Sequence, residues 1–301
     1  CTQTNTRKSA QLTLVKTWVT ARNGETATVT SSGFTNNGSS GLSTSTGNNT
    51  TTGTAVTVYA GEVGTISEVL SNSANYTASL ACTGNATALV GNSLTINPAD
   101  TTITCTQTNT RKSAQLTLVK TWATNSIAGN TTTVTSSGFD NSASSGLSTA
   151  TVVGNTTTGS AVTVYAGESG TISETFGVGS AVNYDAVLSC TGNATALVGS
   201  TLTVDPADTS ITCTETNTRK GATLTLVKTW AANSIAGNTT TVTNSGFINN
   251  ASSGLSTATA LGNTTTGTAI TVYAGESGTI SETFGVGSAA NYDAVLSCTG
   301  N

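Results

Sequence analysis

The feature that most constrains this chain is an internal repeat of about 105 residues. Residues 11–18, Gln-Leu-Thr-Leu-Val-Lys-Thr-Trp, return unchanged at 115–122 and with one substitution at 223–230. Cys1, Cys105 and Cys213 occupy equivalent places that are 104 and 108 residues apart. A repeat of this length is too long for a solenoid unit and has the size of an independently folding domain. We therefore expect a row of similar domains.

Composition and polarity patterns indicate an all-β fold. The sequence is rich in Thr, Ser, Asn and Gly, lacks Met and His, and has only 8% charged residues. β-branched residues favour strands, and residues that favour helices are scarce. In the first repeat, strands are expected at 10–19, 26–31, 41–45, 54–59, 64–70, 75–82, 93–96 and 101–108. This density of short strands predicts tandem Ig-like or prealbumin-like β-sandwich domains of about 105–108 residues, arranged as a rod.

The repeats also suggest domain limits. We expect residues 1–9 to be the last strand of a preceding repeat, 10–111 and 112–219 to be two complete repeats, and 220–301 to be a third repeat without its last strands. Because the chain opens on Cys1 in the middle of a repeat, we expect it to be part of a longer protein. The segments at 5–10, 109–114 and 217–222 join one repeat to the next with little slack, which favours a stiff rod.

Four of the six cysteines form pairs with equal spacing. These pairs, each 23 residues apart, are Cys82 with Cys105 and Cys190 with Cys213. Strand alternation turns both members of a pair inward, so we predict two disulfides and an oxidising compartment. We expect Cys1 and Cys298 to pair with cysteines outside this sequence. Buried free thiols, or a pairing of the type Cys1–Cys82, remain alternatives. Zinc is not expected, because the chain has no C-x-x-C motif and no His.

The same alternation turns three reactive side chains inward in each repeat. Lys16 shares the face of its strand with Leu14 and Trp18, Glu68 shares the face of apolar neighbours, and Asn109 lies on the face of Cys105. The matching positions in the other repeats are Lys120, Glu174 and Asn217, and then Lys228 and Glu282. The asparagine of the third repeat would lie beyond this sequence.

A lysine in a core is costly unless it is paired, neutralised or chemically consumed. One interpretation is an intramolecular isopeptide bond, because burial lowers the pKa of a lysine and leaves a nucleophilic amine. A neighbouring glutamic acid can polarise the asparagine amide and transfer protons while ammonia leaves. The alternatives are a buried Lys–Glu pair completed by the asparagine, and a lysine that reaches out to water.

These motifs resemble those of a known family. Val-Lys-Thr-Trp at 15–18, the inward Glu68 followed by Tyr76, and Cys-Thr-Gln-Thr-Asn-Thr at 105–110 look like the CnaB/SpaA-type prealbumin-like domain of bacterial surface proteins and pili. The resemblance covers every repeat and is strongest in the first and last strands. It implies that Lys16 bonds to Asn109 with the help of Glu68. The sequence departs from the family pattern in two ways: it adds a cysteine pair, and it lacks a Tyr-x-x-x-Glu segment before Glu68. The predicted disulfide could by itself hold the strands together under force, in place of the isopeptide bond.

The sequence therefore predicts a bacterial structural protein that is secreted and displayed at the cell surface. It would form a stalk, fibre or filament of covalently locked repeats, with neighbouring copies of the chain and a host or cell surface as partners. The alternative is the repetitive stalk of an adhesin whose binding domain lies outside this sequence. A lectin-like module ranks third, because the loops contain hardly any aromatic residues.

Other function classes find little support in the sequence. An enzyme acting on an external substrate is the least favoured, because a chain without His has no Ser/His/Asp set, and no phosphate-binding loop or cofactor motif occurs. The basic residues form isolated pairs, such as Arg7 with Lys8, and no basic patch for nucleic acid is expected. No apolar run is long enough to span a membrane, so no membrane insertion is expected.

Overall fold

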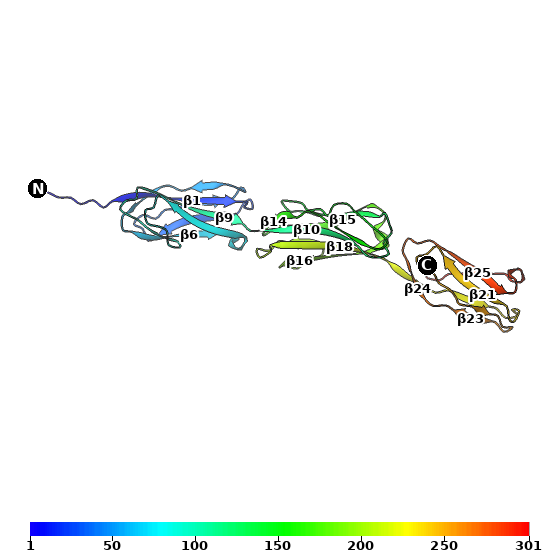
Figure 1. Cartoon of the computed structure of the whole chain (residues 1–301). Helices are drawn as coiled ribbons and strands as arrows, with labels where there is room; N and C mark the ends of the chain where they lie inside the picture. The colour runs from blue at the N-terminus through cyan, green and yellow to red at the C-terminus, as the bar shows by residue number, and fades with distance from the viewer. Residues whose placement is uncertain (301) are drawn as a thin grey trace.

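The computed structural model describes residues 1–300 of the chain. The chain folds into three elongated sandwiches that follow one another in a row, with a bend between the second and the third (Figure 1). Within residues 1–300, every regular element is a strand apart from three short 3₁₀ turns: η1 (Ser73–Asn75), η2 (Ala181–Asn183) and η3 (Ala289–Asn291). The predicted all-β class and tandem sandwich architecture are confirmed.

The first repeat contains nine strands in two sheets. They are β1 (Ser9–Val19), β2 (Thr26–Ser32), β3 (Ser43–Thr44), β4 (Thr50–Thr52), β5 (Val56–Tyr59), β6 (Val63–Leu70), β7 (Tyr76–Thr83), β8 (Ser93–Thr95) and β9 (Thr102–Arg111). One sheet has the order β4-β1-β9-β7, and β5 also pairs with β1. The other sheet has the order β3-β2-β6-β8. Alternating burial along β1, β2 and β9 directs one face of each strand into the space between the sheets.

The second repeat has the same plan. Its strands are β10 (Ser113–Trp122), β11 (Thr131–Ser137), β12 (Ser148–Thr149), β13 (Asn155–Thr158), β14 (Val162–Tyr165), β15 (Ser169–Val178), β16 (Tyr184–Thr191), β17 (Thr201–Thr203) and β18 (Ser210–Arg219). The third repeat contains β19 (Gly221–Leu224), β20 (Val227–Trp230), β21 (Thr239–Ser245), β22 (Ser256–Thr257), β23 (Asn263–Thr266), β24 (Ile270–Tyr273) and β25 (Thr279–Val286).

The first and last strands of a repeat lie side by side and run parallel. In the first repeat β1 pairs with β9 over nine residues, with Lys16 opposite Gln107 and Trp18 opposite Asn109. On its other edge β9 pairs with the antiparallel strand β7. The chain therefore enters a sandwich at one end of β1 and leaves it at the opposite end of β9. A pull on the two ends acts along these two strands and shears the ladder between them.

The interior of the first repeat is divided along β1. Its first half contributes Ala10, Leu12 and Leu14 to a large apolar cluster shared by both sheets. Near its end, Trp18 belongs to a smaller cluster and makes an edge contact with Tyr76, with ring centroids 5.6 Å apart. Lys16 lies between the two clusters. The apolar burial on both sides holds the backbone around this lysine in place.

The strands depart from the sequence expectation in three places. The β4 strand was not expected, and β3 has only two residues. The last strand extends to Arg111 instead of ending at Thr108, because the β7 ladder continues to a Tyr76–Arg111 pair. Since β10 begins at Ser113, only Lys112 separates the two repeats. The segment interpreted as a link is thus mostly strand.

Within residues 1–300, no helix is long and apolar enough to cross a membrane. The same residues contain no group of three or more His, Cys, Asp or Glu that could hold a metal ion.

Candidate functional site

The lysine, glutamate and asparagine of the first repeat meet between the two sheets. Lys16 lies on β1, Glu68 on β6 of the facing sheet, and Asn109 on β9. Lys16 Nζ lies 3.3 Å from Glu68 Oε1, and Asn109 Nδ2 donates to the same oxygen at 2.9 Å. One carboxylate oxygen therefore touches both the amine and the amide. We call these three residues the first triad.

The amine of the first triad is cut off from water. The Lys16 side chain is 0% exposed, which excludes the interpretation of a lysine that reaches out to solvent. Its Nζ donates to the Thr17 carbonyl oxygen at 2.8 Å and lies 4.3 Å from the centre of the Trp18 ring. Burial lowers the pKa of Lys16, although the neighbouring Glu68 carboxylate acts in the opposite direction. Burial thus favours the uncharged, nucleophilic form of the amine.

The asparagine of the first triad has one satisfied and one unsatisfied polar atom. Asn109 is fully buried, and its Oδ1 has no hydrogen-bond partner. An unpartnered buried carbonyl oxygen is costly in a folded protein. A half-turn of the amide would direct this oxygen at Glu68, where a protonated carboxyl would donate to it. The same contact would polarise the amide carbon towards attack.

The second repeat repeats this arrangement. Lys120 Nζ lies 3.0 Å from Glu174 Oε1, and Asn217 Nδ2 donates to that oxygen at 2.9 Å. Lys120 and Asn217 are fully buried, the pKa of Lys120 is lowered by burial, and Asn217 Oδ1 is again unpartnered. In the third repeat Lys228 lies 2.7 Å from Glu282 Oε1 and is 16% exposed. The expected asparagine of that repeat lies outside the described residues.

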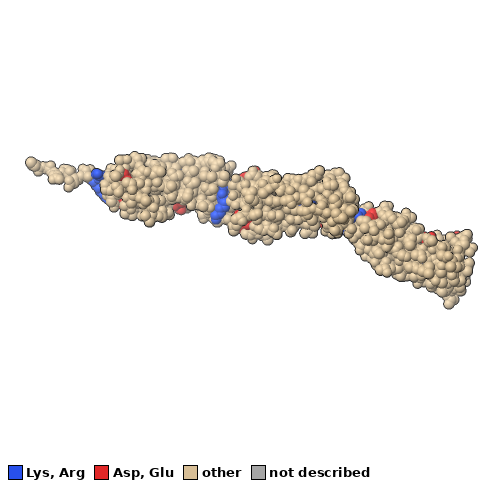
Figure 2. Space-filling view, viewed as in Figure 1, with Lys and Arg blue, Asp and Glu red and all other residues tan. Residues whose placement is uncertain are grey.

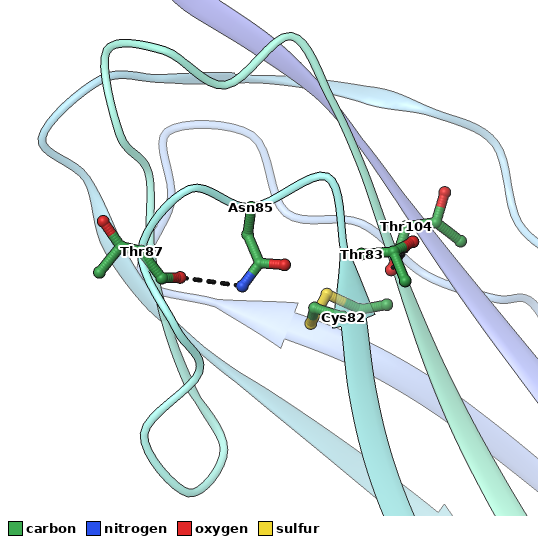
Figure 3. Close-up of a disulfide and its surroundings, with 6 residues drawn as sticks. Cys82, Thr83, Asn85, Thr87 and Thr104 are labelled. Carbon is green, nitrogen blue, oxygen red and sulfur yellow. Dashed lines mark hydrogen bonds between the residues drawn. A yellow bond between two sulfur atoms is a disulfide. The ribbon is translucent and has the colours of Figure 1, made fainter.

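Disulfides tie the last strand to its other neighbour. Cys82 and Cys105 are directly opposite each other in the β7–β9 ladder and are joined, with a Cα–Cα distance of 4.0 Å (Figure 3). Cys190 and Cys213 are joined in the same way. Within the described residues, Cys1 and Cys298 are free and exposed.

The turn after Cys82 requires a glycine. Gly84 has a φ of 78°, and a Cβ at this position would lie 2.0 Å from the carbonyl oxygen of Thr102. Beyond it, the Asn85 side chain donates to the Thr87 carbonyl oxygen at 2.9 Å and closes the turn (Figure 3). The glycine lets the chain leave β7 close against β9, beside the disulfide.

Basic residues at the junctions form a second recurring arrangement. On the face shown in Figure 2, the visible Lys and Arg side chains lie near the N-terminal end and where one repeat meets the next. At the first junction Arg111 Nε donates to the Ala166 carbonyl oxygen at 2.9 Å, and its guanidinium lies 5.5 Å from the centre of the Tyr165 ring. Its Nη1 lies 3.7 Å from Glu168 and 3.5 Å from Asp140. The last strand of one repeat thus docks into the next.

This docking uses the same turn in every repeat. A Tyr-Ala-Gly-Glu turn receives the arginine at 59–62, 165–168 and 273–276. The arginine donates from Nε to the alanine carbonyl in all three cases: Arg7 to Ala60, Arg111 to Ala166 and Arg219 to Ala274. Backbone bonds reinforce the first junction, since Lys112 donates to Asn75 and accepts from Ala166. We call this arrangement the arginine clasp.

Sequence reasoning missed the arginine clasp, although strand parity contains the clue. Arg111 follows Asn109 by two residues on the same strand face, so it also turns inward, but the expected end of the strand at Thr108 hid this. Alternation also places Gln107 on the inward face, but no role was predicted for it; its Nε2 donates to the second oxygen of Glu68 at 3.4 Å. The equivalent residue of the second repeat is Glu215, which is visible when the repeats are aligned.

No protein-family model and no curated protein matches this sequence. Several solved structures are similar to it. The major pilin T-13 of Streptococcus pyogenes is 13% identical, with 71% of this chain and 100% of that chain covered and a TM-score of 0.37. A C-terminal fragment of the pilus adhesin SpaC of Lactobacillus rhamnosus is 11% identical, with 70% and 98% covered and a TM-score of 0.33. Two B repeat units of the collagen-binding protein of Staphylococcus aureus are 11% identical, with 93% and 69% covered and a TM-score of 0.26. These likenesses concern the fold alone, and their TM-scores lie below 0.5.

Proposed function

We propose that this chain is a structural extracellular protein, a stalk, fibre or filament built from repeats at 10–111, 112–219 and from 220 onwards. Each complete repeat is locked by an amide bond between its first and last strands. The observation that carries the proposal is the buried contact of one glutamate oxygen with both a lysine amine and an asparagine amide, at 3.3 and 2.9 Å in the first repeat.

The bond would form within the triad without any external reagent. The uncharged Nζ of Lys16 attacks Cγ of Asn109, so that the Nζ–Cγ bond forms and the Cγ–Nδ2 bond breaks. Glu68 accepts a proton from the attacking nitrogen and delivers it to Nδ2, which leaves as ammonia. No electron is gained or lost. In the second repeat the same roles fall to Lys120, Asn217 and Glu174.

The position of the bond suits a load-bearing role. The chain enters a repeat at the start of β1 and leaves at the end of β9, and the amide would join these strands near the exit. Force would pass along β1 to Lys16, cross to Asn109 and continue into the next repeat. Residues 17–108 would then carry no load. The disulfide would lie outside this path and would protect the β7–β9 edge of the sheet instead.

Two further parts of the proposal follow from the cysteines. Disulfides persist in oxidising compartments, which supports a place outside the cell, at its surface. Cys1 and Cys298 occupy the same positions in their repeats as Cys105 and Cys190, so we propose that each pairs with a cysteine of its own repeat that lies outside this sequence.

Intact-mass measurement tests the proposal directly. Each amide bond releases one ammonia and lowers the mass by about 17 Da, so two complete repeats predict a loss of about 34 Da. Each disulfide removes two hydrogens, about 2 Da, and this difference disappears on reduction. Lys16→Ala combined with Lys120→Ala is the matched control and should show only the disulfide loss. A denatured, reduced chain with the mass of its sequence would contradict the proposal.

A further inference from the structure

Beside their triads, the two complete repeats differ at one buried position of the last strand. The position two residues before the asparagine is Gln107 in the first repeat and Glu215 in the second. Both side chains are buried, at 9% and 8% exposure, and both lie opposite the triad lysine in the ladder of first and last strands. The difference therefore places a second carboxyl in the centre of the second repeat.

In the first repeat, the side chain at this position contacts the glutamate of the triad and fixes its orientation. Gln107 Nε2 donates to Glu68 Oε2 at 3.4 Å, while Lys16 and Asn109 both contact Oε1. The carboxylate is thus fixed through both oxygens, and its orientation towards the amide follows. Such fixing of a reacting group is what a fast intramolecular step requires.

We propose that this position is a positioning site for the triad glutamate, and that in the second repeat Glu215 fills it as a protonated carboxyl sharing one proton with Glu174. This inference rests on the proposed amide bond. A carboxyl can replace the donor of Gln107 only while it carries its proton, because an ionised carboxylate is only an acceptor.

The surroundings favour a proton on this pair. The charged groups facing Glu215 are Glu174 on β15 and Lys120 on β10, and its neighbour across the β16 ladder is the apolar Leu188. Burial, followed by the charge of Glu174, raises the pKa of Glu215, although Lys120 opposes the shift. Two buried carboxyls with one lysine between them cannot both ionise without repulsion.

The proton has a consequence for the lock. A protonated Glu215 would offer Glu174 the donor that Gln107 offers Glu68 in the first repeat, and it would hold the Glu174 carboxylate in the matching orientation. Once Glu215 ionises, the donor is lost and the two carboxylates repel each other. The second repeat should therefore close more slowly as the pH rises, by up to about tenfold per pH unit above the pKa of Glu215. The first repeat lacks this dependence because Gln107 does not titrate.

Refolding kinetics test the inference. The chain is isolated unfolded, before any amide bond has formed, and diluted into a series of buffers from about pH 5 to about pH 8.5, which begins above the ordinary pKa of a glutamate. Samples are quenched and digested, and the masses of the peptides are measured by mass spectrometry, so that the loss of ammonia is followed separately in each repeat. We expect the ratio of the second-repeat rate to the first-repeat rate to fall with increasing pH.

Two isosteric substitutions provide the controls. Glu215→Gln should make the second repeat as insensitive to pH as the first, and Gln107→Glu should transfer the sensitivity to the first repeat. A pH dependence that survives Glu215→Gln, or a constant ratio of rates in the native chain, would overturn the inference.

A separate readout distinguishes a failure of the amide bond from a failure of the shared proton. If neither repeat releases ammonia, the proposed lock and the positioning role both fall. The unfolding of the second repeat at increasing pH still tests the shared proton. Because the folded-state pKa of Glu215 is raised, its contribution to stability is present below the unfolded pKa and is lost as the pH rises through the folded pKa. Glu215→Gln should abolish this loss, and an unchanged loss would refute the shared proton.

Discussion

Stretching single molecules should reveal which bonds carry load, and Lys16→Ala is the informative change. The folded first repeat spans about 35 Å between Ser9 and Arg111, since β1 and β9 lie side by side at about 3.3 Å per residue. The released chain of about 103 residues would reach about 360 Å. The disulfide hides the 22 residues between Cys82 and Cys105, about 77 Å of chain. Rupture of the unlocked, oxidised repeat should thus add about 250 Å.

The locked repeat should behave differently. With the amide intact, only the strand ends outside Lys16 and Asn109 can extend, and they are already extended in the fold. We therefore expect no rupture step from the first repeat of the native chain, a step of about 250 Å from Lys16→Ala, and about 325 Å when Lys16→Ala is measured under reducing conditions. The assay is force spectroscopy of the full chain, with Thr17→Ala on the neighbouring position of β1 as the control. Steps of about 250 Å from the native first repeat would refute the assignment of the lock to Lys16.

The remaining predictions concern stability and shape. Replacing Cys82 and Cys105 by serine should lower the free energy of unfolding of an unlocked first repeat by roughly 3 kcal/mol, measured by denaturant titration, because the disulfide closes a loop of 23 residues. Arg111→Ala should increase bending between the first two repeats and shorten the maximum dimension in X-ray scattering, because it removes the arginine clasp at that junction; an unchanged profile would assign the stiffness to the backbone alone. In Asn109→Ala, which cannot form the amide, the lowered pKa of Lys16 means that the unfolded state binds the proton more tightly, so stability should rise with pH up to about 10.4. Urea titration at increasing pH checks this, and a fall over the same range would contradict it.

Much of the fold follows from alternation in the sequence, because a strand with one buried face must place every second residue inside. This rule places Lys16, Glu68 and Asn109 between the sheets before any partner of their strands is known. Alternation alone does not give the order of strands in a sheet. That β1 lies beside β9, so that Lys16 and Asn109 come from neighbouring strands, is decided by packing between residues about 90 apart.

Other features were beyond sequence reasoning for a physical reason. The β4 strand, three threonines, has no apolar residue to mark it and forms because β1 offers an edge for pairing. The arginine clasp depends on the approach of two repeats, which no periodicity within one repeat encodes. The change from Gln107 to Glu215 is plain in the sequence. Its meaning depends on the 3.4 Å contact that shows what the position does.

The single residue between β9 and β10 also sets how far each sandwich is rotated, about the long axis of the rod, relative to the sandwich before it. Buried residues of β9 carry odd numbers, such as Cys105 and Asn109, whereas those of β10 carry even numbers, such as Leu116 and Lys120. One nearly continuous ribbon therefore turns opposite faces to two successive cores. Adding or removing one residue at Lys112 would swing the next sandwich to the other side of the ribbon and change which loops face the same direction along the rod. The direction in which the surface loops face would thus fix the length of this junction, even where its residue type is free to vary.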